Sequence, residues 1–153
     1  MDWIGAERIL AVMCIEIKHF VTLEIRLKEG VINAYDCNIP VFTEDAFFAH
    51  LQPVLELLPI LLRQSGIMVH LPEKLLNQPW TFKKRIDYLP KNESGAACGS
   101  YSLGFIEHLI TRTSLKPNQT LMNDNTVERM QWVWAVGVIN KMLEPAPLVT
   151  TSK

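Results

Sequence analysis

The sequence predicts an α+β protein in which a mixed sheet of about four or five strands is flanked by helices. Two kinds of periodicity indicate this class. Apolar and polar residues alternate with a period of two near the start of the chain, as in strands, and apolar residues recur at helical spacing in later segments. The chain has 153 residues, which is the size of one domain.

Composition and charge exclude several functional classes. Hydrophobic residues make up 48% of the chain and charged residues 20%, so the chain can bury a sizeable core. The 15 basic and 16 acidic residues give a net charge of −1, so we expect neither nucleic acid nor a membrane surface as a partner. The apolar runs 9–17 and 54–62 are too short to span a membrane. We therefore expect a soluble protein, and its amino terminus lacks the pattern of a secretory signal.

Cysteine usage indicates the compartment. The odd number of cysteines, Cys14, Cys37 and Cys98, fits reduced thiols better than a disulfide framework. We therefore expect an intracellular protein, located in the nucleus or the cytoplasm. Histidines and cysteines show no spacing typical of a metal site, so we expect neither a metal nor another cofactor.

The predicted strands form a hairpin and one later element. Residues 9–17 are apolar and rich in branched side chains, which predicts a strand buried on both faces. Residues 19–27 alternate, which predicts a half-buried strand, and residues 31–36 return after a turn signal. Residues 80–88 also alternate. The basic run from Lys83 to Arg85 in their middle predicts a solvated face rather than a nucleic-acid patch.

Three segments have the spacing of helices. Thr43 is a predicted N-cap for a helix over about 44–64, which Pro53 and Pro59 should kink or split. A second helix begins at Cys98, after a loop of small residues, and ends near Arg112. Its predicted buried stripe consists of Tyr101, Phe105, Ile106, Leu109 and Ile110.

The last helix is predicted over residues 127–143, with Asp124 or Asn125 as its cap. Trp132 is expected, like Trp134, to be a packing residue of this helix. The predicted apolar face consists of Met130, Trp134, Gly137, Val138 and Met142. Residues 1–144 then form one domain, and 145–153 form a disordered tail.

Cys98 has the setting of a nucleophile. The positive end of the helix macrodipole stabilises thiolate over thiol, and backbone N–H groups near Cys98 and Gly99 can hold an oxyanion. The alternative is a small buried thiol that only packs at the start of a helix.

His19 and Asp36 stand at hairpin ends that lie side by side. His19 opens one strand and Asp36 closes the next. A carboxylate beside an imidazole fixes its tautomer and stabilises the imidazolium, as the base of a cysteine protease requires. Taken singly, a surface histidine is the more common explanation for His19 and a turn-forming aspartate the more common one for Asp36; the convergence with Cys98 favours the catalytic interpretation.

Two stretches of the chain resemble a known family. Residues 15–25 with 32–37 are similar to the "HW-V … Y-D-S" segment of ubiquitin-like-protein (SUMO) specific cysteine proteases, the adenain-like group. Residues 90–107 resemble that family's "P-Q-x-x-N-G-x-D-C-G-x-Y-x-L-K-F-I-E" segment, and 123–129 resemble the ending of its divergent plant, transposon-associated branch. The match extends from about residue 9 to 142.

The resemblance implies a papain-like fold and thiol-dependent cleavage after the carboxyl-terminal glycine of a SUMO-type modifier, which is then the expected partner. It assigns His19 as general base, Asp36 as the group that orients the imidazole, and Cys98 as nucleophile. Asn92 falls where the family places its oxyanion glutamine, and its amide can donate there.

The chain departs from the family pattern at several positions. Phe20 replaces the tryptophan after the histidine and is the predicted substrate contact, and Ala97 replaces the aspartate before the cysteine. The family's amino-terminal segment, which supplies another tryptophan, has no counterpart. We therefore expect a partial catalytic domain that is a weak or inactive hydrolase. The alternative is a catalytically degenerate, protease-like binding module.

Overall fold

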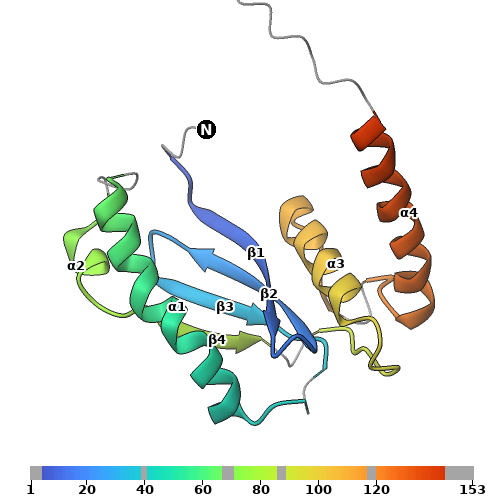
Figure 1. The fold of residues 1–153 in the computed structure, drawn as a ribbon, viewed down its shortest axis with the longest axis horizontal. Coiled ribbons are helices and arrows are strands. Elements are labelled where there is room, and N and C mark those ends of the chain that lie inside the picture. Colours follow the sequence, from blue (N-terminus) through green and yellow to red (C-terminus); the bar gives the residue numbers. More distant parts are fainter. Residues whose placement is uncertain (1–4, 39–40, 67–70, 86–88, 117–119, 144–153) are drawn as a thin grey trace, which may run out of the picture.

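The computed structural model describes residues 5–38, 41–66, 71–85, 89–116 and 120–143 (Figure 1). The α+β class is confirmed, whereas the expected tail lies outside the described residues. The elements in chain order are β1 (Arg8–Ile15), β2 (His19–Arg26), β3 (Val31–Tyr35), α1 (Glu44–Ser65), α2 (Glu73–Leu76), β4 (Thr81–Arg85), α3 (Cys98–Thr111) and α4 (Asp124–Leu143).

The four strands form one mixed sheet in the order β1-β2-β3-β4, as predicted. The first three strands pair antiparallel, and β4 lies parallel to β3 after the long connection through α1. Thr22 pairs with Tyr35, so the start of β2 lies beside the residues that follow β3. This register positions the candidate site at one end of the sheet.

β1 is an edge strand, so the prediction that 9–17 is buried on both faces is wrong. It pairs with β2 alone, and Val12 and Cys14 are exposed. The strand also ends earlier than expected, at Ile15, because Glu16 and Ile17 turn the chain with φ values of 51° and 59°.

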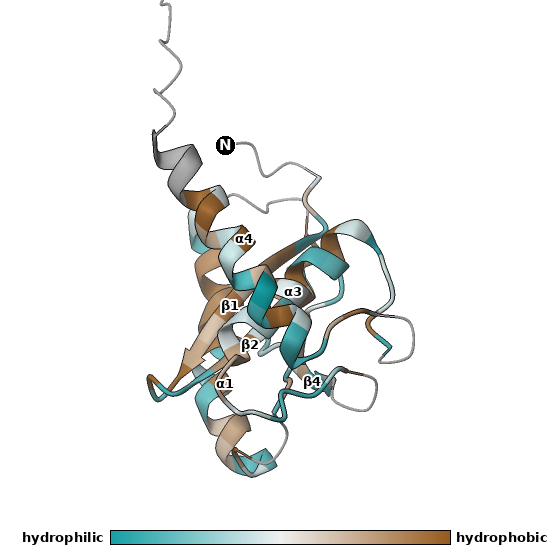
Figure 2. Cartoon of the chain, turned by 90° about the vertical axis from the view of Figure 1, so that its right-hand side faces the viewer, coloured by the Kyte–Doolittle hydropathy of each residue, from teal (hydrophilic) through white to brown (hydrophobic). Residues whose placement is uncertain are grey.

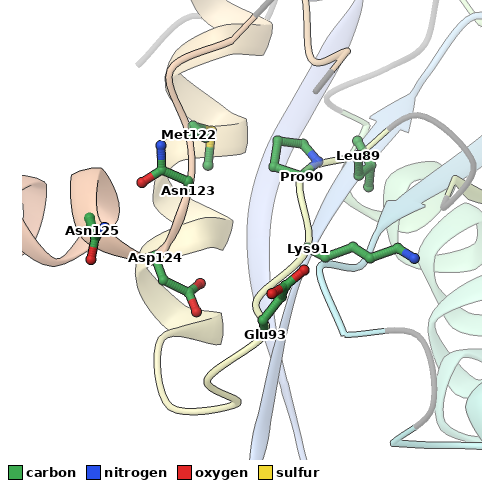
Figure 3. A pocket seen from close by; sticks show the side chains of 8 residues that line it. All are labelled: Leu89, Pro90, Lys91, Glu93, Met122, Asn123, Asp124 and Asn125. Carbon is green, nitrogen blue, oxygen red and sulfur yellow. The ribbon is translucent and has the colours of Figure 1, made fainter. Parts of the chain in front are cut away.

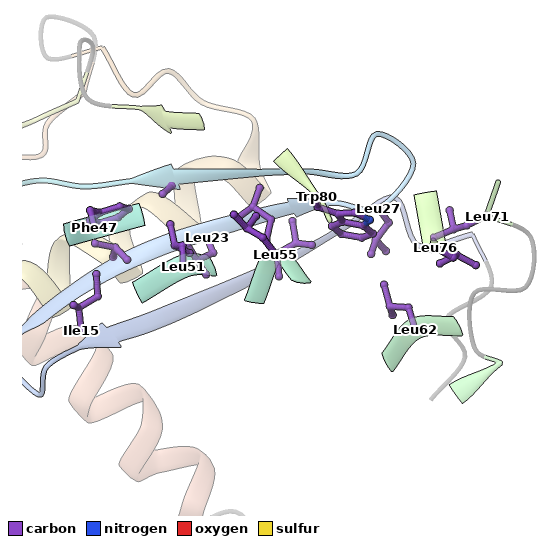
Figure 4. Close-up of a cluster of buried hydrophobic side chains, with 14 residues drawn as sticks. Ile15, Leu23, Leu27, Phe47, Leu51, Leu55, Leu62, Leu71, Leu76 and Trp80 are labelled. Carbon is purple, nitrogen blue, oxygen red and sulfur yellow. The ribbon is translucent and has the colours of Figure 1, made fainter. Parts of the chain in front are cut away.

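Both faces of β2 are covered, which corrects the prediction of a half-buried strand. Val21, Leu23 and Ile25 pack against α1 in the main core (Figure 4). The opposite face, which carries Thr22 and Glu24, is buried on the α3 side of the sheet. The buried residues that α1 contributes to the main core are Phe47, Leu51, Leu55 and Leu62.

α1 is continuous through both prolines, so the expected split is absent. The Thr43 side chain accepts a hydrogen bond from the backbone N–H of Ala46 (3.3 Å), which confirms it as the N-cap. Burial of one apolar face, with Pro59 inside it, offsets the backbone hydrogen bonds that proline removes. By length and composition α1 could span a membrane, and its buried face packs against the sheet.

α3 lies on the opposite face of the sheet from α1. It begins at Cys98, as predicted, and Tyr101 and Phe105 are fully buried. Ile110 is exposed, so the predicted stripe is wrong at that position. The buried face instead includes Ser102, whose position turns toward β2.

α4 begins at Asp124 rather than Val127, and its cap is Asn123. The Asn123 Oδ1 atom accepts a hydrogen bond from the Thr126 N–H (3.1 Å).

The apolar residues of α4 are mostly not buried. Met130 and Trp134 are half-buried, but Trp132, Gly137 and Val138 are exposed, so the predicted packing holds only for the first turns. The side chain of Met142 lies outside the described set. Figure 2 shows that α4 lies outside α3 and runs away from the sheet, so among the described residues its later turns are poorly covered.

Candidate active site

His19 and Asp36 form a buried pair at the end of the sheet. The Nε2 atom of His19 lies 2.7 Å from Oδ1 of Asp36, and both residues are 2% exposed. The backbone N–H of Asn38 donates to the same oxygen (2.9 Å). The predicted contact is confirmed. Because Nε2 faces the carboxylate, Nδ1 is the ring nitrogen left to take a proton from a thiol.

Asp36 is held as a carboxylate. Burial by itself raises the pKa of Asp36, but hydrogen bonds from His19 and Asn38, together with the charges of His19 and Lys84, bring that pKa below its ordinary value. The anionic form can therefore stabilise an imidazolium beside it.

Cys98 is the first residue of α3 and is 9% exposed. Ala97 caps the helix without a side-chain hydrogen bond, which leaves N–H groups of the first turn available to a ligand. Gly99 lies against Phe20, because a Cβ atom on Gly99 would be 3.5 Å from Phe20 Cδ2. The start of α3 therefore meets β2 at the residue after His19. The approach of Cys98 Sγ to within about 4 Å of the imidazole stays a prediction.

Phe20, whose role as a substrate contact stays a prediction, is partly exposed near the start of β2. Its side chain is 38% exposed and packs beside Gly99, adjacent to the predicted nucleophile. A second aromatic residue near the site, Phe42, was not predicted from the sequence; its ring centroid lies 6.1 Å from that of His19. Phe42 is half-buried and also contacts the ring of His50 at 5.6 Å.

Cys37 is a second buried thiol in the same apolar cluster as Cys98. Burial, together with the charges of Asp36 and Cys98, raises the pKa of Cys37 to about 12. Cys37 is therefore a neutral thiol near pH 7 and lacks the character of a nucleophile.

Asn92 is a buried residue beside Cys37. Its backbone N–H donates to the Cys37 carbonyl (3.0 Å), and its Oδ1 accepts from Ser94 Oγ (3.0 Å) and the Gly95 N–H (3.1 Å). By distance and angle, Nδ2 has no hydrogen-bond partner among the described residues, although Asn92 is buried and its side chain also interacts with the Cys37 thiol. A buried donor without a partner is what an oxyanion site offers before substrate binds.

The loop that carries Asn92 is fixed by α3 and α4. The Tyr101 hydroxyl lies 2.9 Å from the Lys91 carbonyl oxygen and 2.8 Å from Asp124 Oδ1, and the Ser94 N–H donates to Asp124 Oδ2 (2.8 Å). Asp124 therefore anchors the loop rather than capping α4. The sequence pointed to Asp124 only through its place in residues 123–129, the segment that resembles the family's ending.

A pocket of about 650 Å³ lies between this loop and the start of α4, where Figure 3 shows the Asp124 side chain extending toward the loop. None of His19, Asp36 and Cys98 lines it, so it is separate from the thiol site.

Lys84 belongs to the site and was missed. Its side chain is 10% exposed, and its Nζ lies 3.3 Å from Asp36 Oδ2. The prediction that Lys83 to Arg85 forms a solvated face is therefore wrong for Lys84. The signal was present in the alternation of 80–88, which places Lys84 on the same face as the apolar Trp80 and Phe82.

The described part of the chain contains no group of three His, Cys, Asp or Glu side chains that could hold a metal ion.

Comparisons with known proteins agree with this geometry. The chain matches the Ulp1 protease family, C-terminal catalytic domain, over residues 2–146. No curated protein matches it.

Solved structures with this fold include the SUMO protease Ulp1 with its catalytic cysteine oxidised to a sulfenic acid. That structure has a TM-score of 0.64 and 14% identity, and the match covers 94% of this chain and 57% of that one. The C-terminal Ulp1 protease domain in complex with Smt3, the yeast ortholog of SUMO, has a TM-score of 0.53 and 15% identity, with 75% and 46% covered.

This chain thus spans about half the length of the solved structures it matches. The family that the resemblance implied is confirmed, while the plant branch stays a prediction. Since the family match extends over nearly the whole chain, the protein belongs to the Ulp1 protease family.

Proposed function

We propose that this protein is a thiol-dependent peptidase or isopeptidase that cleaves after the carboxyl-terminal glycine of a SUMO-type modifier. One observation carries the proposal: the buried His19–Asp36 pair lies at the end of the sheet against which the helix that begins with Cys98 is packed. The modifier class follows from the family and from the Smt3 complex of a protein with this fold.

The first step forms the acyl-enzyme. Cys98 gives its proton to Nδ1 of His19, and the carboxylate of Asp36 stabilises the resulting imidazolium. The thiolate attacks the carbonyl carbon of the modifier's last glycine, and a C–S bond forms. The oxyanion accepts hydrogen bonds from N–H groups at the start of α3 and from Nδ2 of Asn92.

The second step releases the products. The imidazolium donates its proton to the leaving amine as the C–N bond breaks, which leaves a thioester on Cys98. Water then attacks the thioester, His19 accepts the proton of that water, and the thiol and a free carboxylate are restored.

A second candidate is a protease-like module that binds the modifier without cleaving it. Ala97 favours this alternative, because it supplies no side-chain cap where the family has an aspartate. In either case we propose an intracellular location, nuclear or cytoplasmic, which the three free cysteines support.

Turnover of a SUMO conjugate with a carboxyl-terminal fluorogenic amide tests the proposed activity. We expect release of the fluorophore by the native chain, none by Cys98→Ala, and much slower release from the matching ubiquitin conjugate. Lack of turnover in a folded chain that still binds SUMO would favour the binding module.

A further inference from the structure

Lys84 and Asp36 meet across two parallel strands. In the register of β3 and β4, Ala34 lies beside Lys84, so Lys84 stands near the end of β3, which Asp36 follows directly. The Lys84 ammonium lies 3.3 Å from Asp36 Oδ2. The other carboxylate oxygen, Oδ1, already faces His19 Nε2 at 2.7 Å and the Asn38 N–H at 2.9 Å. Both oxygens therefore have separate partners.

The Lys84 side chain is held in place by more than its charge. Its Nζ lies 4.4 Å from the centroid of the Phe47 ring, and the side chain is only 10% exposed. A mostly buried ammonium is stable only beside an anion or the face of a ring. Lys84 has both, which distinguishes it from a lysine on a solvated face.

We propose that Lys84 is a positioning residue of the thiol chemistry: by binding Oδ2 of Asp36, it fixes the carboxylate so that Oδ1 remains directed at His19. The role rests on the proposed function. Lys84 acts through Asp36 and contacts no reacting atom. A carboxylate without this contact could rotate about its Cβ–Cγ bond and lose the alignment with the imidazole.

Lys84 also maintains the charge of Asp36. The ionisable groups that face this carboxylate are His19 from β2, Lys84 from β4 and the neighbouring thiol of Cys37. From α1, the uncharged Phe47 lies against the Lys84 ammonium. Burial raises the pKa of Asp36, and without Lys84 only the hydrogen bonds of Asp36 and the charge of His19 oppose this rise. The carboxylate therefore takes up a proton at a higher pH.

The test compares Lys84→Met with Lys84→Arg, using Lys83→Met, which alters the exposed neighbour on the same strand, as the matched control. Two readouts are measured against pH: kcat/KM for the fluorogenic SUMO conjugate and the rate of Cys98 alkylation by iodoacetamide. The second readout needs no substrate, so it tests Lys84 even if the proposed cleavage fails.

For Lys84→Met we expect the acid limb of both profiles to move to higher pH, with kcat reduced and KM nearly unchanged. Lys84→Arg should restore the native profile in large part, and Lys83→Met should retain it. If Lys84→Met does not fold, the neutral Lys84→Gln is measured in its place with the same expectation. Profiles that keep the native acid limb in a folded neutral variant would overturn the proposal, because a purely structural lysine would lower only the folded fraction.

Discussion

The Thr22 hydroxyl on β2 donates a hydrogen bond to the backbone carbonyl of Ser102 on α3 (2.7 Å), although 80 residues separate them. β2 begins with His19, and α3 begins with Cys98. This fully buried contact therefore fixes the strand that carries the predicted base against the helix that carries the predicted nucleophile.

Replacing Thr22 by valine should weaken both stability and catalysis. Thr22→Val keeps the shape of the side chain but leaves the Ser102 carbonyl without this donor, so we expect the free energy of unfolding to fall by about 1–2 kcal/mol. Turnover should fall by about tenfold or more, because small displacements of reacting groups are costly. Urea denaturation and the fluorogenic assay measure the two effects. The control is Thr81→Val at an exposed position of β4. Equal behaviour of the two variants would contradict the linking role.

The three thiols should differ in reactivity. Near neutral pH we expect iodoacetamide to label Cys98 first, because Cys98 is the first residue of α3 and the predicted partner of the His19 imidazole. Cys37, whose pKa is raised to about 12, should be labelled last, and the exposed Cys14 should fall between them. Peptide mapping by mass spectrometry measures the order, which should disappear in denaturant. Labelling of Cys14 or Cys37 ahead of Cys98 in the folded protein would refute this prediction.

Phe20 should contribute to substrate binding rather than to thiol activation. We expect Phe20→Ala to raise KM for the SUMO conjugate by about tenfold, the equivalent of one aromatic contact, while Cys98 alkylation stays at the native rate. Steady-state kinetics separate KM from kcat. The matched control is Phe48→Ala on α1, where Phe48 is 44% exposed compared with 38% for Phe20. An unchanged KM in Phe20→Ala would remove Phe20 from the substrate cleft.

Glu24 should make the stability of the protein depend on acid pH. Burial by itself raises the pKa of Glu24, but hydrogen bonds from Asn33, Tyr35 and Arg8 bring the pKa below its ordinary value of 4.5. A carboxyl with a lowered folded pKa stabilises the protein above its unfolded pKa, and this stabilisation is lost as pH falls through the folded pKa.

We therefore expect Glu24→Gln to lower the free energy of unfolding by about 2 kcal/mol at pH 7. The difference from the native chain should shrink below about pH 4. Urea denaturation across this pH range is the measurement. The exposed Glu29→Gln serves as the control. A difference that stays constant down to pH 3 would show that charge plays no part.

The end-of-sheet geometry of the site was predictable because it depends on local patterns. The period of two and the turn near Gly30 set the hairpin register, and that register brings His19 and Asp36 together. The helical spacing after Cys98 likewise indicated its place at a helix start.

Contacts between distant segments could not be predicted in the same way. The alternation in β2 shows that it has two faces, but nothing in the local pattern tells that α3 covers the face with Thr22 and Glu24. The burial of Lys84 was not predicted, because its charge suggested an exposed side chain although the alternation places it on the face of Trp80 and Phe82. The exposure of the apolar residues of α4 was not predicted either, because residues such as Val138 become buried only where another element covers them.

The central claim is that Cys98 is the nucleophile that receives the end of a SUMO-type modifier. Its most direct test is a SUMO chain whose last glycine is replaced by a propargyl amine, a group that reacts only with an activated thiol in reach. We predict one adduct per chain on Cys98, none with Cys98→Ala, and slow formation with Asp36→Asn, which removes the carboxylate that supports the imidazolium. An adduct on Cys14 or Cys37, or no adduct in a folded chain whose Cys98 still reacts with iodoacetamide, would contradict the claim.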